Sequence, residues 1–277
     1  MTLVVGKVLE EVLEKVLPLK FTRVIHPALK RKYPFIIYTL EMPIFSGFLY
    51  IPIERKLGIA TNFKYKLWIS GENRAQLKEI FNLQVYERMF SVERGNVVID
   101  VGANIGVFTI KAARQVGPTG KVIAIEPEPG NLALLRKNAK HLANVVVVGK
   151  AASSSKGREK LYGAPKSWLF STTDNDNYGL GYIEVEADTV DNIVSELGLD
   201  RVDFIKIDVE GAELEVLKGA TKTLNLPGVG IAMEACHYDS ELDEVRYYLE
   251  SRGIATWASP DRAFLYAKTP ALAERGF

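Results

Sequence analysis

The stretch VVIDVGANIGVF, residues 97–108, decides the fold of this chain. An apolar and mostly β-branched run ends on Asp100, and Gly102, Asn104 and Gly106 follow before an apolar pattern with helical spacing. This order predicts a buried strand, a tight turn and the start of a helix. Because glycine has no side chain, such a turn lets a ligand approach the backbone closely.

A second apolar run, residues 121–125, ends on Glu126 and Pro127. Glu126 follows the last glycine by about 20 residues, which is the usual place for a carboxylate that holds a ribose. The glycines are spaced G-x-x-x-G, unlike the G-x-G-x-x-G of dinucleotide-binding folds, so an NAD-dependent oxidoreductase is disfavoured. With Asp100 two residues upstream, the pattern predicts a turn that binds S-adenosylmethionine (SAM).

From residue 91 onward, apolar runs alternate with helical patterns, which is typical of a parallel sheet with helices on both faces. The expected strands are 97–101, 121–126, 145–150, 202–208, 229–235, 256–259 and 263–268. The expected helices are 105–116, 131–141, 189–197, 211–224 and 241–251. The last two strands flank Pro260, Asp261 and Arg262, a hairpin signal. We therefore expect an α/β, Rossmann-like class I methyltransferase fold with a mostly parallel seven-stranded sheet and a C-terminal antiparallel hairpin.

The first 90 residues have a different pattern and are expected to form an N-terminal extension, with the methyltransferase domain at 91–277. An amphipathic helix is predicted over 1–17, where it would pack on the body of the protein or join a homodimer. A basic stretch runs from Lys20 to Lys32. Short strands are expected at 34–40, 47–53 and 64–70, separated by Pro43, Gly47 and Gly58, with a helix at 72–90. This extension is where we expect acceptor selection or oligomerisation.

Composition sets outer limits on the function. Residues 1–95 carry 15 Lys and Arg against 9 Asp and Glu, so the extension is basic although the whole chain has a net charge of +1. No apolar run is long enough for a transmembrane helix, and no signal peptide is evident. The single Cys236 excludes an internal disulfide framework, so a cytoplasmic location is expected.

Two further constellations carry acidic or basic side chains at strand ends. In VDFIKIDVEGAELEVLKGA, residues 202–220, Asp208 ends a strand and Glu210 and Glu213 follow at once. Ligands bind at the carboxyl ends of such strands, although Glu210 and Glu213 also suit the first turn of a helix. The run MEACH, residues 233–237, places Glu234 and His237 at the same edge, where Glu234 is expected to orient His237 or bind the acceptor.

Three segments together resemble the FkbM family of SAM-dependent methyltransferases. They are VVIDVGANIGVFTIKAA, KVIAIEPEPGNLALLRKN and DFIKIDVEGAELEVLKGA, and the resemblance covers about residues 96–234. It implies O-methylation of a hydroxyl on a sugar, glycan or natural product. It also implies a set of SAM contacts and places Asp208 and Glu210 near the reacting centre. The implied SAM contacts are Asp100, Gly102, Ala103, Asn104, Gly106, Glu126 and Asn131, to which Pro127 and Asp208 are added as cofactor-binding candidates.

Methyl transfer to a hydroxyl needs alignment of the two reactants and a base that takes the proton. The candidate bases are Asp208, His237 and Glu210, with no metal required. In the alternative, Asp208, Glu210 and Glu234 bind a divalent ion that lowers the pKa of the hydroxyl.

Two other functions stay open at this stage. One is an RNA methyltransferase that uses the basic stretch, and the other is a non-catalytic SAM-binding scaffold. Residues 152–187 interrupt the regular alternation and are expected to form a lid or a disordered insertion. Aromatic residues of this insertion either form a wall against a sugar ring or a base or serve packing, and these two alternatives stay open for Trp168, Phe170, Tyr178 and Tyr182.

Overall fold

The computed structural model describes residues 49–52, 57–61, 66–70, 74–163, 170–171 and 181–271. Several sequence predictions lie outside this part of the chain and stay predictions. They are the helix 1–17 with its proposed dimer contact, the basic stretch from Lys20 to Lys32, the strand 34–40, and the side chains of Trp168 and Tyr178.

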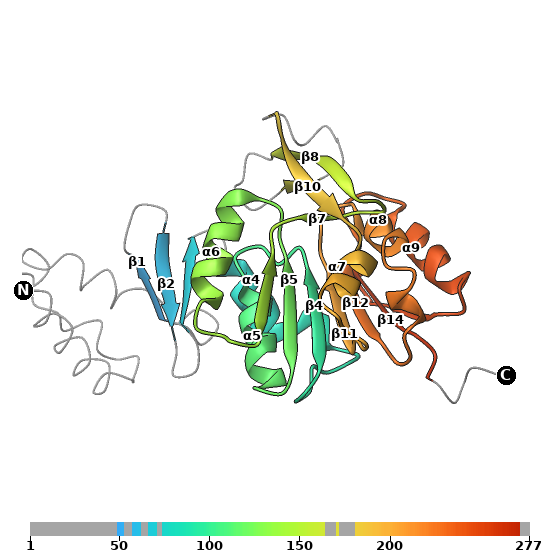
Figure 1. Cartoon of the computed structure of the whole chain (residues 1–277), viewed down its shortest axis with the longest axis horizontal. Helices are drawn as coiled ribbons and strands as arrows, with labels where there is room; N and C mark the ends of the chain where they lie inside the picture. The colour runs from blue at the N-terminus through green and yellow to red at the C-terminus, as the bar shows by residue number, and fades with distance from the viewer. Residues whose placement is uncertain are drawn as a thin grey trace, which may run out of the picture.

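A seven-stranded sheet in the order β13-β14-β12-β11-β4-β5-β6 forms the centre of the molecule (Figure 1). Its strands are β4 (Val97–Val101), β5 (Lys121–Ile125), β6 (Val145–Val148), β11 (Phe204–Ile207), β12 (Gly230–Glu234), β13 (Ala255–Ala258) and β14 (Phe264–Lys268). Within this sheet, β14 is the one strand that runs in the opposite direction to the others, so its pairings with β12 and β13 are antiparallel. The other neighbouring strands pair in parallel. The predicted fold class, a Rossmann-like class I methyltransferase sheet with a terminal hairpin, is confirmed.

The strand order locates the ligand site. The chain builds the sheet outward from β4 through β5 to β6, then returns to the other side of β4 with β11. In open α/β sheets, ligands bind outside the carboxyl ends of the strands where the order reverses. That point lies between β4 and β11, which pair in parallel with Asp100 beside Lys206.

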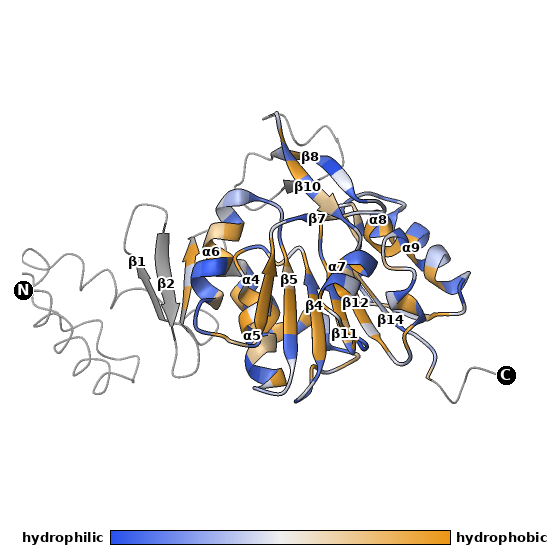
Figure 2. Cartoon of the chain, in the orientation of Figure 1, coloured by the Kyte–Doolittle hydropathy of each residue, from blue (hydrophilic) through white to orange (hydrophobic). Residues whose placement is uncertain are grey.

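Helices cover both faces of this sheet. They are α5 (Val107–Val116), α6 (Pro129–Ala139), α7 (Val190–Glu196), α8 (Glu213–Lys218) and α9 (Glu241–Glu250). On one face Phe108 of α5 stacks on Phe204 of β11, and on the other Leu217 and Val245 pack against Ile205. Figure 2 shows the consequence, since the strands are hydrophobic along their length and the helices turn hydrophilic faces outward.

The N-terminal part of the described chain adds a small antiparallel sheet, β1-β2-β3. Its strands are β1 (Leu49–Pro52), β2 (Leu57–Thr61) and β3 (Lys66–Ser70). Strand β2 was not predicted, because Gly58 was interpreted as a break, and that was wrong. As the middle strand, β2 bonds to a partner on each side, and this pairing outweighs the weak strand preference of one glycine.

The small sheet is joined to the central core. The backbone N–H of Trp68 in β3 donates to Oδ1 of Asn138 in α6 (2.7 Å), and Nδ2 of Asn138 donates to the Trp68 carbonyl (3.0 Å). Leu67 and Ile69 are fully buried in the same hydrophobic cluster as Phe108. Residues on both sides of the predicted boundary near 90 thus share one core, and the division into 1–90 and 91–277 stays a prediction.

The helix predicted over 72–90 is interrupted. The structure has α4 (Arg74–Leu77), a π-helical segment (Lys78–Leu83) and a short 3-10 turn (Val85–Glu87). Gln84 between them is in the left-handed conformation (φ 48°), and its N–H donates to the Glu79 carbonyl. This residue ends the helix and redirects the chain, so that Tyr86 is buried rather than exposed on a helix surface.

The helix predicted over 211–224 is also shorter than expected. It is divided into α8 (Glu213–Lys218) and a 3-10 turn (Thr223–Asn225). Gly219 ends α8, and a Cβ there would lie 2.0 Å from the Ser153 carbonyl oxygen. The close approach of a distant segment, which no helix periodicity reveals, accounts for the break.

The described residues of the insertion at 152–187 form a small sheet, and its expected role as a lid stays a prediction. Strands β7 (Ala151–Ala152), β8 (Gly157–Gly163), β9 (Phe170–Ser171) and β10 (Tyr182–Asp188) pair in the order β7-β10-β8-β9. Tyr182 lies 5.8 Å from the Tyr162 ring and is half exposed, and the predicted aromatic wall stays a prediction. None of the helices within the described residues has the length and apolar character needed to span a bilayer.

Candidate active site

The turn after β4, residues 102–106 and here the first turn, presents backbone rather than side chains. Gly102 (φ 71°) and Gly106 (φ 90°) are in the left-handed region, which favours glycine. The N–H groups of Gly102 and Ala103 donate to the Ile125 carbonyl at the end of β5 (3.0 and 2.9 Å). Asn104 is also left-handed (φ 52°). The two neighbouring strands therefore fix the shape of this turn.

Glu126, the predicted ribose-binding carboxylate, holds the first turn from the side. Its Oε2 accepts the N–H of Asn104 (2.7 Å), and its Oε1 accepts the N–H of Glu128 (2.9 Å). Burial raises the pKa of Glu126 to about 7, against the opposing effect of these two hydrogen bonds. The carboxylate therefore has acceptor capacity left for a hydroxyl donor that would stabilise its charged form.

Lys206 lies beneath the first turn and neutralises the buried acids around it. Its Nζ donates to the carbonyls of Val101 (3.2 Å) and Gly102 (2.6 Å) and lies 3.2 Å from Oδ1 of Asp100. It also lies 3.6 Å from Oδ2 of Asp208. Burial opposes its charge, but Asp100 and Asp208 outweigh that effect and raise the pKa of Lys206. One ammonium group thus connects the ends of β4 and β11.

Asp100 itself is fully buried and lies away from the cavity described below. Its Oδ2 accepts a hydrogen bond from the Thr109 hydroxyl (2.5 Å), and its Oδ1 faces Lys206. The geometry gives Asp100 a structural role under the turn. We therefore leave its predicted SAM contact out of the proposal that follows.

The turn after β11, residues 208–212 and here the second turn, presents side chains instead. Glu210 has the left-handed conformation (φ 58°), and Gly211 follows at φ 99°. Both carboxylate oxygens of Glu213 accept backbone N–H groups of this turn, from Val209 (2.9 Å) and Gly211 (3.0 Å). Glu213 therefore shapes the turn and leaves Asp208 and Glu210 to face the cavity.

Asp208 has two polar neighbours on one oxygen. Its Oδ2 accepts a hydrogen bond from the Tyr86 hydroxyl (2.8 Å) and lies 3.6 Å from Nζ of Lys206. Both contacts are made to the same oxygen and orient the carboxyl group. The side chain is 22% exposed, so the carboxylate is accessible to a ligand.

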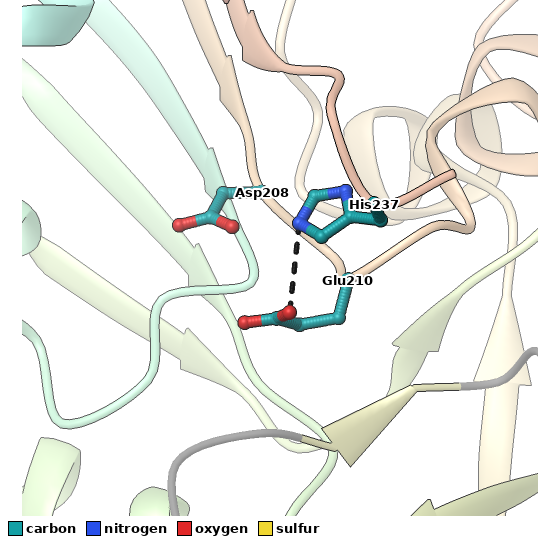
Figure 3. Close-up of side chains that lie close together, drawn as sticks. All are labelled: Asp208, Glu210 and His237. Carbon is teal, nitrogen blue, oxygen red and sulfur yellow. Dashed lines mark ion pairs between the residues drawn. The ribbon is translucent and has the colours of Figure 1, made fainter. Parts of the chain in front are cut away.

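His237 follows β12 and points toward Glu210 and Asp208, as Figure 3 shows. Its Nε2 lies 3.5 Å from Oε2 of Glu210. Its Nδ1 lies 3.0 Å from Oε2 of Glu241. The same oxygen accepts a hydrogen bond from the backbone N–H of His237 (2.8 Å). The buried Glu241 therefore orients the imidazole. The suggestion that Glu234 orients it was wrong, because Glu234 is instead near Cys236 and Tyr86.

The ionisation of this cluster separates the candidate bases. Burial opposes the charge of His237, but Glu241, Glu213 and Glu210 outweigh it and raise its pKa to about 10. Burial, with Asp208 nearby, raises the pKa of Glu210 to about 8. At neutral pH, His237 is therefore an imidazolium, and Glu210 holds a proton most of the time.

A cavity joins the two turns at the carboxyl edge of the sheet. Several predicted site residues line it, namely Gly102, Asn104, Glu126, Pro127, Asn131, Asp208 and Glu210. Ala103 and Gly106 belong to the first turn but lie outside this lining, as does His237. A Cβ on Gly106 would lie 2.6 Å from Leu135, so this glycine serves helix packing. The inserted sheet borders the same cavity through Ala151, Ala152 and Leu161.

The only metal-ligand arrangements among the described residues differ from the set considered from sequence. Asp208, Glu210 and His237 form one group with ligand atoms within 4.8 Å of one another, and Glu213, His237 and Glu241 form another. The alternative set of Asp208, Glu210 and Glu234 is not among them. In both groups His237 already supplies a positive charge.

Several residues of this site were not identified from the sequence. Lys206 had a signal, since a lysine inside the apolar strand FIKI has to find a buried partner. Glu241 had the ordinary appearance of an acid in a first helical turn. Tyr86 had no signal, because it is 122 residues from Asp208 in the chain.

A family model for the FkbM methyltransferase domain matches residues 100–254. The chain belongs to the FkbM methyltransferase family. With the class I sheet order described above, membership of the family makes SAM its methyl donor. Tyr86 and the small N-terminal sheet lie before the matched region, although they pack on the same core.

Several relatives of this FkbM-family chain are named methyltransferases. It is 31% identical over 223 residues to methyltransferase sdnD of Sordaria araneosa, with 67% of this chain and 85% of that one covered. It is 30% identical over 227 residues to 31-O-demethyl-FK506 methyltransferase FkbM of Streptomyces tacrolimicus, with 70% and 86% covered. The solved FkbM methyltransferase of Methylobacillus flagellatus KT gives a TM-score of 0.47 at 23% identity, covering 71% of this chain and 52% of that one.

Proposed function

We propose that this chain transfers a methyl group from SAM to a hydroxyl oxygen of a sugar, glycan or natural product. The observation that carries the proposal is the placement of the Asp208 carboxylate in the same cavity as Gly102 and Asn104. A relative whose name describes methylation at an oxygen, the 31-O-demethyl-FK506 methyltransferase, supports it. In this proposal the donor turn and the acceptor carboxylate share one cavity.

The residues of the first turn suit the donor. Gly102 and Asn104 offer backbone without bulky side chains, and Glu126 offers carboxylate oxygens to the ribose hydroxyls. Pro127 and Asn131 complete this side of the cavity. In our proposal Ala103 and Gly106 act through the shape of the turn. When bound, SAM supplies an electrophilic methyl carbon, so this chain needs no nucleophile of its own.

Asp208 is the base that the geometry favours among the three candidates. His237 is protonated at neutral pH and has no free nitrogen with which to accept a proton. Glu210 has a raised pKa and is largely protonated there. Asp208, in contrast, lines the cavity and is oriented by its contacts with Tyr86 and Lys206. Because both of these contacts are made to Oδ2, we assign proton acceptance to Oδ1.

His237 and Glu210 have a supporting role in this proposal. Nε2 of the His237 imidazolium lies 3.5 Å from Oε2 of Glu210. When Glu210 loses its proton, it adds a negative charge beside this imidazolium. Glu241 holds the ring in place from the opposite side. We propose that this pair shapes the acceptor side of the cavity and moderates the charge around Asp208, without accepting the proton of the hydroxyl.

The remaining expectations follow from this function. We propose that the enzyme is cytoplasmic and that its partner is a small-molecule or glycan acceptor. The RNA alternative depends on Lys20 to Lys32, outside the described residues. The scaffold alternative predicts SAM affinity without transfer to any acceptor.

One experiment tests the function. The protein is incubated with SAM that carries a tritiated methyl group and with separated glycan, lipid, metabolite and RNA fractions from the source cells. We expect label in the glycan or metabolite fraction as a base-stable methyl ether. Asp208→Asn is the matched variant, and it should bind the demethylated product normally while transferring no label. Label in RNA alone, or none in any fraction from a protein that binds SAM, would contradict the proposal.

A further inference from the structure

Tyr86 is the one residue of the N-terminal extension whose side chain reaches Asp208 through a hydrogen bond among the described residues. It lies in the 3-10 turn Val85–Glu87, before the region that the family model matches. Its hydroxyl donates to Oδ2 of Asp208 at 2.8 Å and lies 3.5 Å from Oε2 of Glu234. A segment outside the family's conserved domain model is thus bonded to the proposed base.

The ring of Tyr86 is held on several sides. It makes edge-to-face contacts with Phe108 (centroids 5.7 Å apart) and Phe264 (5.6 Å), and Nζ of Lys206 lies 5.4 Å from its centroid. Only 5% of the residue is exposed. A ring fixed in this way cannot turn its hydroxyl away without disturbing the core. The hydrogen bond to Asp208 is therefore set by packing and does not depend on a bound ligand.

The charged groups that face this pair are the acids Glu79, Glu210 and Glu234 and the cation Lys206. Asp100 lies on the far side of Lys206, 3.2 Å from its Nζ. Burial, followed by Asp208 and Glu234, raises the pKa of Tyr86 well above its usual range. The hydroxyl therefore remains a donor throughout the physiological pH range.

We propose that Tyr86 is a positioning residue, whose buried hydroxyl holds the Asp208 carboxylate in the orientation that the reaction needs. The inference rests on the proposed role of Asp208 as the base. By occupying Oδ2, Tyr86 leaves Oδ1 as the oxygen that faces an acceptor hydroxyl. It also makes the extension a part of the active site, because the site is incomplete without residue 86.

The chain offers a matched control for this role. Tyr266 is also a buried tyrosine, and its hydroxyl donates to the Val85 carbonyl (2.6 Å) next to Tyr86. Tyr86→Phe and Tyr266→Phe each delete one buried hydroxyl from the same region and keep the ring. Only the first removes a hydrogen bond to a carboxylate of the site.

The primary measurement is independent of activity. Aspartate carboxyl carbons are labelled with carbon-13, and the Asp208 signal is identified as the one that Asp208→Asn removes. At a fixed pH we expect this signal to change its chemical shift in Tyr86→Phe, because the hydrogen-bond donor to Oδ2 is lost. In Tyr266→Phe the signal should keep its wild-type position. The same chemical shift in wild type and both variants would overturn the inference.

A second measurement follows the rate in whichever acceptor fraction takes label. Tyr86→Phe should lower kcat by about tenfold with an unchanged KM for SAM, whereas Tyr266→Phe should keep the wild-type kcat. An equal loss of kcat in both variants would show a merely structural role. If wild type labels no fraction, the proposed function fails, whereas the carbon-13 chemical shift still decides whether Tyr86 holds Asp208.

Discussion

The two turns at the carboxyl edge of the sheet have similar backbone features but present different groups to the cavity. Each follows a parallel strand of the sheet, each contains a left-handed residue that is not glycine (Asn104 and Glu210), and each has backbone N–H groups held by a glutamate. The first turn has two glycines and presents backbone. The second turn presents two carboxylates. Backbone suits the binding of a large methyl donor, whereas carboxylate side chains suit the removal of a proton from an acceptor hydroxyl.

The holding glutamates differ in origin, and that difference has a consequence. Glu126 reaches the first turn from the next strand, so the turn depends on the assembled sheet. Glu213 directly follows the second turn in the chain, and its carboxylate accepts two of the N–H groups of that turn. The first turn should therefore be sensitive to changes elsewhere in the sheet, while the second turn is locally stabilised.

The largest effect is expected where the two turns touch. At Gly102 a Cβ would lie 1.8 Å from the Asp208 carbonyl oxygen, and its φ of 71° is unfavourable for alanine. Gly102→Ala should lose more than about 4 kcal/mol of unfolding free energy and all measurable SAM binding. Urea unfolding and calorimetry measure the two losses. Gly157→Ala is the control, since a Cβ there meets nothing within 4 Å, and both quantities should be unchanged.

A second prediction separates the functions of the two turns. Asp208→Asn should lower the methyl transfer rate by about 10²–10⁴-fold, the usual contribution of a general base, with donor affinity retained. Steady-state kinetics and calorimetry with the demethylated product check this together. A variant that retains full turnover would remove Asp208 from the role of base.

A third prediction concerns the charges around the second turn. The folded state binds the His237 proton more tightly than the unfolded state, with a pKa of about 10 against the usual 6.5. The stability it contributes is complete below about pH 6.5 and disappears as the pH rises toward 10. The pKa of Glu210 is also raised in the folded state, from its usual 4.5 to about 8. The stability that this group contributes is therefore also lost as the pH rises, between about pH 4.5 and 8.

Unfolding free energy should therefore fall by roughly 5 kcal/mol between pH 6.5 and 9.5. Urea unfolding at each pH measures the fall, and His237→Gln should make it smaller. Stability that stays constant or rises over this interval in wild type would show that His237 is not an imidazolium in the folded protein.

The smallest effect is expected from removal of divalent ions. Because the His237 imidazolium already lies among Glu210, Glu213 and Glu241, we expect methyl transfer to be unchanged after dialysis against EDTA. Rates are compared before dialysis, after it, and after addition of Mg²⁺. A loss that Mg²⁺ restores would instead support a metal at Asp208, Glu210 and His237.

The sequence carried most of the information about the central sheet. Apolar runs with an acid at their end marked β4, β5, β11 and β12 to within two residues at either end. Strand β2 and the interrupted helix at 74–87 were not recognised, because strand pairing overrode Gly58 and a left-handed Gln84 ended the helical pattern. Local patterns report periodicity, and these two outcomes depend on neighbours that are distant in sequence.

The same division holds at the site. The sequence by itself determined that Gly102, Asn104, Glu126, Asp208 and Glu210 would meet at one edge, because the carboxyl ends of parallel strands always gather there. Only the tertiary structure decided what surrounds them. It placed Lys206 under both turns, Glu241 behind His237 and Tyr86 against Asp208. Burial and the distances between charges set the protonation of each group, and neither quantity is written in the order of the residues.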